Sequence, residues 1–191
     1  VKKQISVLLA MSLLLIALLS GCSKTPAEIS APEWETASDT ASGFSYEVPA
    51  DWTTTEDATG QGSIIYIPAD ADVSAGTSNV NILVQDVSGQ KAASMKDMKA
   101  ALESDLENQL ISNGFEKVEN LKVEELEAPI GSVCSVSYDT YLSGMKFTQT
   151  QFYPLIDDYI IVITATNVGD EVAPSVEEVA EYMALTLKKA E

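Results

Sequence analysis

Residues 130–166 read IGSVCSVSYDTYLSGMKFTQTQFYPLIDDYIIVITAT, and this stretch decides the fold. The turn-forming pairs Ser143-Gly144 and Asp157-Asp158 divide it into three segments, which are predicted strands at 130–142, 145–153 and 159–166. Strands joined by such short turns pair antiparallel, because a parallel connection needs a long crossover. The third segment is the most apolar, so we expect it at the centre of the sheet.

Two amphipathic helices are predicted, one before and one after these strands. The first spans about 91–112, where apolar residues recur every three or four positions at Met95, Met98, Leu102, Leu106 and Leu110, and Asn113-Gly114 follows as a stop. The second spans about 175–188, with an apolar stripe at Val176, Val179, Met183 and Leu187 and capping-box spacing between Ser175 and Glu178. Each helix must bury its stripe against the sheet, so the chain is expected to form an α+β layered fold.

Shorter strands precede the first helix. Phe44, Tyr46 and Val48 alternate with polar residues, which predicts a strand at 44–48 with these side chains on one face. Further strands are expected at 52–56, 63–67 and 79–87, and an acidic strand at 115–127 follows the first helix. Trp52 is expected to pack against the start of the sheet rather than to stack on a ligand. The predicted order is therefore three or four strands, a helix, four strands and a helix.

The first 21 residues have the pattern of a signal peptide. Lys2 and Lys3 precede an apolar segment at 5–19, which is shorter than the about 20 residues that a membrane-spanning helix needs. The segment Leu19-Ser20-Gly21-Cys22 then looks like a bacterial lipobox, in which the cysteine thiol receives a diacylglycerol and becomes the first residue of the mature chain. Lipidation of Cys22 with two acyl chains would hold the protein on the extracytoplasmic face of the cell membrane, so the membrane is its expected first partner.

Residues 22–42 are expected to form a flexible tether behind the lipidated cysteine. They are rich in Ser, Thr, Ala, Pro and acidic residues and show little apolar periodicity. The folded domain is then expected at 43–191. Trp34 is the one aromatic residue of the tether. Two places remain open for it: docked on the domain, or at the lipid interface.

Charge and composition exclude several functions. The chain has 29 acidic residues, 11 lysines, no arginine and no histidine, and its net charge is −18. Loss of Lys2 and Lys3 with the signal peptide makes the mature charge −20. Nucleic acid is not an expected partner, because a polyanion would be repelled. Histidine is the commonest general base and a common metal ligand, so its absence leaves no cofactor and no catalytic residue expected.

Two features of the chain could still carry chemistry. Cys134 is the only thiol left once Cys22 is lipidated, and it shares a strand face with Val136 and Tyr138. It is expected to be a buried structural residue rather than a nucleophile, because no histidine can activate it. The second feature is a polar loop with Asp70 and Asp72, near Asp51, Glu56 and Asp57 in sequence. Such carboxylates suit Ca²⁺, but no full EF-hand loop is present, so no specific metal site is expected.

The element order resembles the PsbP-like superfamily, which includes the extrinsic photosystem II protein, Ran-binding Mog proteins and many small bacterial lipoproteins. The resemblance is carried by the opening Gly43-Phe44-Ser45-Tyr46-Glu47-Val48-Pro49-Ala50-Asp51-Trp52 and by the closing Glu177-Glu178-Val179-Ala180. It covers about residues 43–190 and implies an antiparallel β-sheet flanked by two helices, a PsbP-like α/β/α sandwich. It carries over no functional residue, because members are accessory or binding proteins with unrelated partners.

Three functions follow as hypotheses. The first is a lipid-anchored extracytoplasmic binding or accessory protein without catalytic activity, which assists an envelope protein complex or captures a ligand. The second is an envelope hydrolase that uses carboxylates alone. The third is a cation-binding lipoprotein. A pocket of acids with raised pKa would favour the hydrolase, an oxygen cage would favour cation binding, and one exposed apolar patch would favour the accessory protein.

Overall fold

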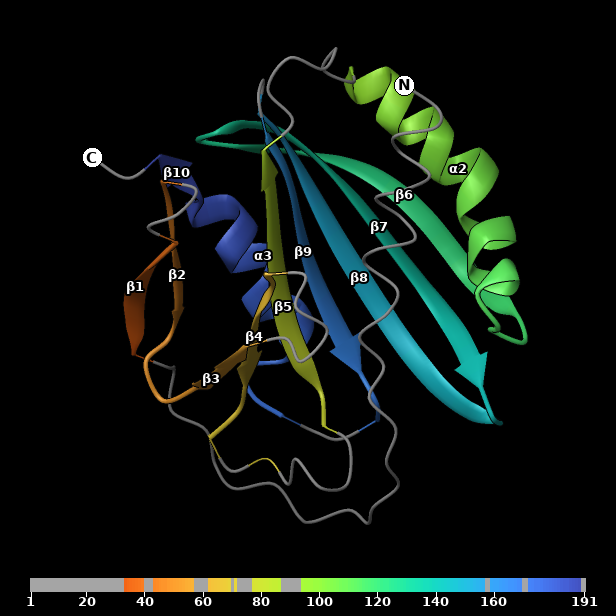
Figure 1. Ribbon diagram of the computed structural model, residues 1–191, viewed down its shortest axis with the longest axis horizontal. Coiled ribbons are helices and arrows are strands. Elements are labelled where there is room, and N and C mark those ends of the chain that lie inside the picture. Colours follow the sequence, from red (N-terminus) through yellow and green to blue (C-terminus); the bar gives the residue numbers. More distant parts are fainter. Residues whose placement is uncertain are drawn as a thin grey trace.

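A computed structural model describes residues 33–39, 43–56, 62–69, 71, 77–86, 94–156, 159–169 and 172–189. Its strands form two antiparallel sheets (Figure 1). The large sheet has the order β3-β4-β5-β9-β8-β7-β6, from the strands Thr53–Glu56, Ile64–Ile67, Asn79–Asp86, Tyr159–Asn167, Met145–Ile156, Gly131–Leu142 and Val118–Ala128. The small sheet has the order β1-β2-β10, from Trp34–Asp39, Phe44–Pro49 and Lys188–Lys189.

The hairpins from β7 to β9 form as their sequence predicts. Leu142 pairs with Met145, and the turn residues between them, Ser143 and Gly144, have φ values of 54° and 76°. Positive φ at both central positions is the geometry of a type I′ hairpin turn, which matches the twist of the flanking strands. Strand β9 takes the central position of the large sheet, as its apolar sequence predicts. The predicted turn at Asp157-Asp158 lies outside the described residues.

Helix α2 (Met95–Ser112) covers the β6 and β7 part of one face of the large sheet. The Ser94 side chain accepts a hydrogen bond from the Asp97 backbone N–H and caps the helix, whereas the predicted first turn at 91–93 lies outside the described residues. The helix packs on β6 and β7. Its buried residues Met98, Leu102, Leu106 and Leu110 form a core with Cys134, Val136 and Tyr138 of β7, so the predicted apolar stripe is confirmed.

The opposite face is covered by α3 (Val176–Thr186), which packs on β9 and also on β2 of the small sheet. The helix therefore lies between the two sheets (Figure 1). Ser175 and Glu178 form the predicted capping box. Phe44, Tyr46 and Val48 of β2 are buried in the same core as Val176, Val179, Met183 and Leu187. An α+β fold with an antiparallel sheet between two helices is therefore confirmed.

Two sequence predictions about the small sheet are wrong. The tether predicted at 22–42 contains β1, whose residues pair antiparallel with β2 from Trp34↔Pro49 to Asp39↔Phe44, so the folded part does not begin at Gly43. The apolar pattern of β1 is weak because only Trp34 and Ala37 contact the core. The second helix ends at Thr186, and Lys188–Lys189 then pair with β2 as β10. The sequence predicted one sheet, and the fold has two.

The predicted signal peptide, Cys22 and the tether up to residue 32 lie outside the described residues. Of the helices that the structure describes, neither is long and apolar enough to cross a membrane.

Candidate functional site

Cys134 lies where the sequence placed it, buried on β7 beneath α2. Its side chain has no solvent exposure, and burial raises the pKa of the thiol to about 11. At neutral pH the sulfur is therefore protonated and shielded, which is the opposite of a reactive cysteine. The prediction that Cys134 is buried is confirmed.

The acidic loop is not brought together as a metal site in the described part of the chain. Asp57, Asp70 and Asp72 lie outside it, and Asp51 is exposed. Among the described residues, no group of three or more acidic or cysteine side chains is arranged to hold a metal ion. Trp52 is 8% exposed and belongs to the core around α3, so its predicted packing role is confirmed.

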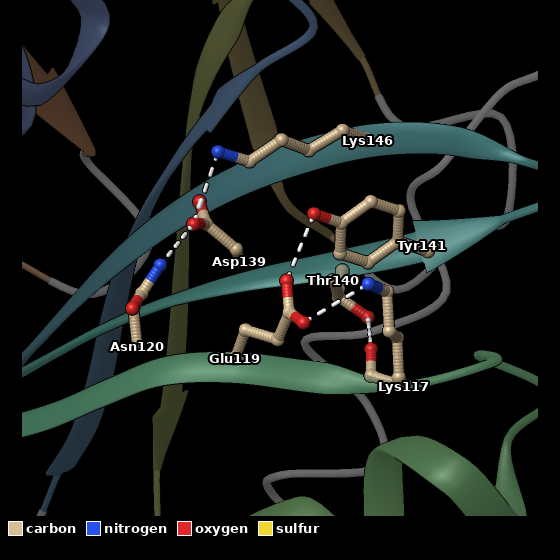
Figure 2. Close-up of polar contacts among 7 residues, drawn as sticks. All are labelled: Lys117, Glu119, Asn120, Asp139, Thr140, Tyr141 and Lys146. Atoms are coloured by element: carbon tan, nitrogen blue, oxygen red, sulfur yellow. Dashed lines mark hydrogen bonds and ion pairs between the residues drawn. The ribbon is translucent and has the colours of Figure 1, made fainter.

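A polar cluster that sequence reasoning missed lies across β6, β7 and β8 (Figure 2). Its β7 residues alternate in step with Val133, which belongs to the core around α3, so the cluster lies on the α3 side of the large sheet. A bulge between Glu119 and Lys122 shifts the pairing of β6 with β7. Asn120 occupies this bulge with a φ of 55°, a left-handed conformation that asparagine tolerates better than most residues. The bulge lets Asn120 reach the neighbouring strand with its side-chain amide.

Asp139 is the centre of this cluster. Its Oδ2 accepts a hydrogen bond of 2.7 Å from Asn120 Nδ2, and its Oδ1 accepts one of 2.7 Å from Thr148 Oγ1. Lys146 Nζ forms an ion pair with Oδ2 at 3.0 Å, and the Asp139 side chain is only 10% exposed. Burial alone would raise the pKa of this carboxyl, but the three hydrogen bonds outweigh burial and lower it. Asp139 is therefore held as a carboxylate with its oxygens occupied.

The second half of the cluster lies next to Asp139 and is more exposed (Figure 2). Glu119 accepts hydrogen bonds from Lys117 Nζ and from the Tyr141 hydroxyl, both at 2.9 Å. Lys117 Nζ also lies 4.0 Å from the centroid of the Tyr141 ring, which is a cation–π contact. Thr140 Oγ1 donates to the Lys117 backbone carbonyl and fixes the start of β6 beside β7.

This surface is neutral, although the chain is strongly acidic. Lys122 and Glu124 of β6 add a third ion pair at 2.8 Å, and their positions opposite Ser137 and Ser135 place them on the same side of the sheet. The three ion pairs that join described residues thus lie on one surface, where lysines and acids balance. We call this surface the paired-charge face; it consists of Lys117, Glu119, Asn120, Lys122, Glu124, Asp139, Tyr141, Lys146 and Thr148.

Little in the sequence predicts the paired-charge face. Asp139 follows the apolar Tyr138 and precedes Thr140 in a long strand, so alternation alone could place it on one side of the sheet but could not name its partners. Those partners depend on the bulge at Asn120 and on the register of β8 against β7. The exposed apolar patch expected of an accessory protein is not found in the described part, where Ile111 is the one exposed large apolar side chain.

No family model matches the chain, and neither does any curated protein sequence. The fold is similar to the solution structure of cyanobacterial PsbP (CyanoP) from Synechocystis sp. PCC 6803, with a TM-score of 0.61 and 11% identity over 87% of this chain and 98% of that one. A crystal structure from Bacteroides thetaiotaomicron VPI-5482 has a TM-score of 0.45 at 17% identity, covering 85% of this chain and 50% of the other. Protein PA94 from Pseudomonas aeruginosa, of unknown function, has a TM-score of 0.43 at 12% identity, covering 71% of this chain and 83% of the other. The likeness to CyanoP shows a PsbP-like fold.

Proposed function

We propose that this protein is a lipid-anchored extracytoplasmic accessory protein without catalytic activity, which binds an envelope protein through its paired-charge face. The observation that carries the proposal is the balance of charge on that face within a chain of net charge −18. An acidic partner would be repelled by an acidic surface, whereas an ordered surface with balanced charge can be buried against a partner without that repulsion.

The order of the side chains on this face also supports binding. Asp139 is fixed by three partners from β6 and β8, and Tyr141 is fixed by Glu119 and Lys117. Side chains that are already held in one conformation lose less entropy when a partner covers them. Tyrosine combines a large apolar ring with a polar hydroxyl, and it is enriched at protein interfaces for that reason.

The protonation states support a role other than catalysis. A general acid at neutral pH needs a carboxyl with a raised pKa, whereas the pKa of Asp139 is lowered. A nucleophilic cysteine needs a lowered pKa, whereas the pKa of Cys134 is raised to about 11. Both pKa shifts therefore argue against catalysis by Asp139 and by Cys134.

The test is site-specific photo-crosslinking in intact membranes. A crosslinking phenylalanine derivative replaces Tyr141 on the paired-charge face, and the same derivative replaces Ser104 on the exposed side of α2 as a control. We expect one discrete protein adduct from position 141 and none from position 104. The added substitution Lys122→Glu, which makes the face acidic, should weaken the adduct from position 141. Equal adduct yields from both positions would contradict the proposal. So would a yield from position 141 that Lys122→Glu leaves unchanged.

A further inference from the structure

Helix α2 ends at the dipeptide Asn113-Gly114, the one place in the chain where glycine follows asparagine. Asn113 is the C-cap residue of the helix, and Gly114 follows it with a φ of 98°. Both residues are exposed, and a Cβ added to Gly114 would meet nothing within 4 Å. No side chain therefore hinders the backbone nitrogen of Gly114, and open space surrounds the position where one would stand.

The other asparagines of the chain lie in different surroundings. Each is followed by a residue with a larger side chain; they are Asn79, Asn81, Asn108, Asn120 and Asn167. Three of them, Asn79, Asn120 and Asn167, use the side-chain amide in a hydrogen bond, and Asn81 is buried. Asn108 is exposed but lies inside α2. Asn113 alone combines an exposed amide with a following residue that has no side chain.

We infer that Asn113 is a site of spontaneous deamidation. The Gly114 backbone nitrogen attacks Cγ of the Asn113 side chain, and the new N–Cγ bond closes a cyclic succinimide. The Cγ–Nδ2 bond breaks, and Nδ2 leaves as ammonia with the proton of the Gly114 N–H. Water then opens the ring at either of its two carbonyl carbons, which leaves an aspartate or an isoaspartate at position 113. One water is consumed for each ammonia released, and nothing is oxidised or reduced.

The folded helix slows this reaction without blocking it. The Gly114 N–H donates to the Ile111 carbonyl at 3.1 Å, so this hydrogen bond must open before the nitrogen can reach Cγ of Asn113. The bond lies at the C-terminal end of α2, and helix ends fray more readily than helix interiors. Opening one hydrogen bond of this kind should slow the folded chain about 2- to 12-fold relative to the unfolded chain.

The product should weaken the end of α2. A carboxylate at position 113 would lie near the carbonyls of Gln109 and Leu110, which both accept from the Asn113 backbone N–H. Negative charge is unfavourable at a helix C-terminus, and the last turn of α2, which the structure describes in full, has no basic residue to balance it. An isoaspartate also lengthens the backbone just before Phe115, whose N–H donates to the Leu110 carbonyl and whose ring is buried beneath α2.

The test is incubation of the full chain, kept soluble by a zwitterionic detergent, at mildly alkaline pH, because base removes the proton of the attacking N–H. Peptide mass spectrometry at successive times measures the aspartyl and isoaspartyl forms at each asparagine. We expect conversion at position 113 of the folded chain and none above background at Asn108, the exposed control in the same helix. Conversion at position 113 should be about 2- to 12-fold faster in denaturant.

Two variants keep the test decisive. Asn113→Gln retains an amide but lengthens the side chain, which disfavours ring closure, so conversion at position 113 should be lost. Gly114→Asn adds a Cβ beside the attacking nitrogen and should slow conversion at position 113. Asparagine tolerates a positive φ better than most residues, so this variant should keep the turn.

Three outcomes would overturn the inference. The first is an intact Asn113 in the folded chain under conditions that convert the denatured chain. The second is equal conversion at Asn108 and Asn113, and the third is an equal rate in the native chain and Gly114→Asn. The converted chain should also melt at a lower temperature than the fresh chain, because the end of α2 is weakened. An unchanged melting temperature would contradict that consequence.

Discussion

The ring of Trp34 lies against the ring of Tyr182, with centroids 4.0 Å apart and planes tilted by 40°. This contact joins β1 to α3, although the sequence predicted that the residues of β1 belong to a tether at 22–42. Tyr182 also donates a hydrogen bond to Glu47 of β2, which raises the pKa of the tyrosine hydroxyl. One side chain of α3 thus holds both long strands of the small sheet, so β1 is part of the folded domain.

Trp34→Ala should therefore destabilise the domain. We expect the free energy of unfolding to fall by about 2 kcal/mol, which is less than for a fully buried tryptophan because Trp34 is half-buried. Urea unfolding followed by circular dichroism measures this, since the signal does not depend on the removed ring. Glu35→Ala, at an exposed position of the same strand, is the control and should change stability by less than about 0.5 kcal/mol. Equal stability of the two variants would mean that the contact with Tyr182 contributes nothing.

Asp139→Asn should destabilise the domain at neutral pH and progressively less in acid. The folded-state pKa of Asp139 is lowered, so its stabilising effect is present above the unfolded value near 4 and is lost as the pH falls through the folded value. We expect a loss of about 2 kcal/mol near pH 7, because charge-assisted hydrogen bonds are weakened. Unfolding of both chains at about pH 7, 5 and 3 should show the difference shrinking only at the most acid point.

Glu119→Gln is the matched control for Asp139, because it removes a carboxylate from the same cluster. The Glu119 side chain is 46% exposed, and exposed ion pairs contribute little to stability. Its effect at neutral pH should be much smaller than that of Asp139→Asn, because solvent screens an exposed ion pair. A difference between Asp139→Asn and the native chain that grows toward acid pH would show that the sign of the Asp139 shift is wrong.

Cys134 should resist thiol reagents until the protein unfolds. With a pKa of about 11 and no solvent exposure, its thiolate is both rare and shielded near pH 8. A chain with Cys22→Ser leaves Cys134 as the only cysteine, so mass spectrometry reports on it alone. We expect labelling in denaturant and almost none without it. Fast labelling of the folded chain would mean that the core beneath α2 opens readily.

Cys22→Ser should release the protein from the membrane. Only a thiol can carry the diacylglycerol thioether, and the serine chain would also lose the lipobox. Metabolic labelling with a fatty acid and membrane fractionation test this together. The native chain should incorporate lipid and sediment with membranes, whereas the variant should do neither. If the native chain never incorporates lipid, the lipid-anchor part of the proposed function is wrong.

Much of the architecture could be read from the sequence because it depends on local patterns. Alternation and two-residue turns predicted the hairpins of β7 and β8, and the apolar run of β9 predicted its central place. The period of Met98, Leu102, Leu106 and Leu110 predicted which side of α2 is buried. These features are repeated along a single segment, so neighbouring residues reveal them without knowledge of distant contacts.

The sequence by itself determined the α+β order of elements, the buried sides of both helices and the burial of Cys134, since each follows from local periodicity. Tertiary structure alone decided that β1 pairs with β2, that Lys188–Lys189 join the same sheet, and that Asp139 meets Asn120, Thr148 and Lys146. It also decided that Thr164 lies buried beside Gln151 and Asn81, with no hydrogen-bond partner for its Oγ1 among the described residues. Such contacts depend on strand register, on a bulge and on packing between residues far apart in the chain, and no local pattern encodes them.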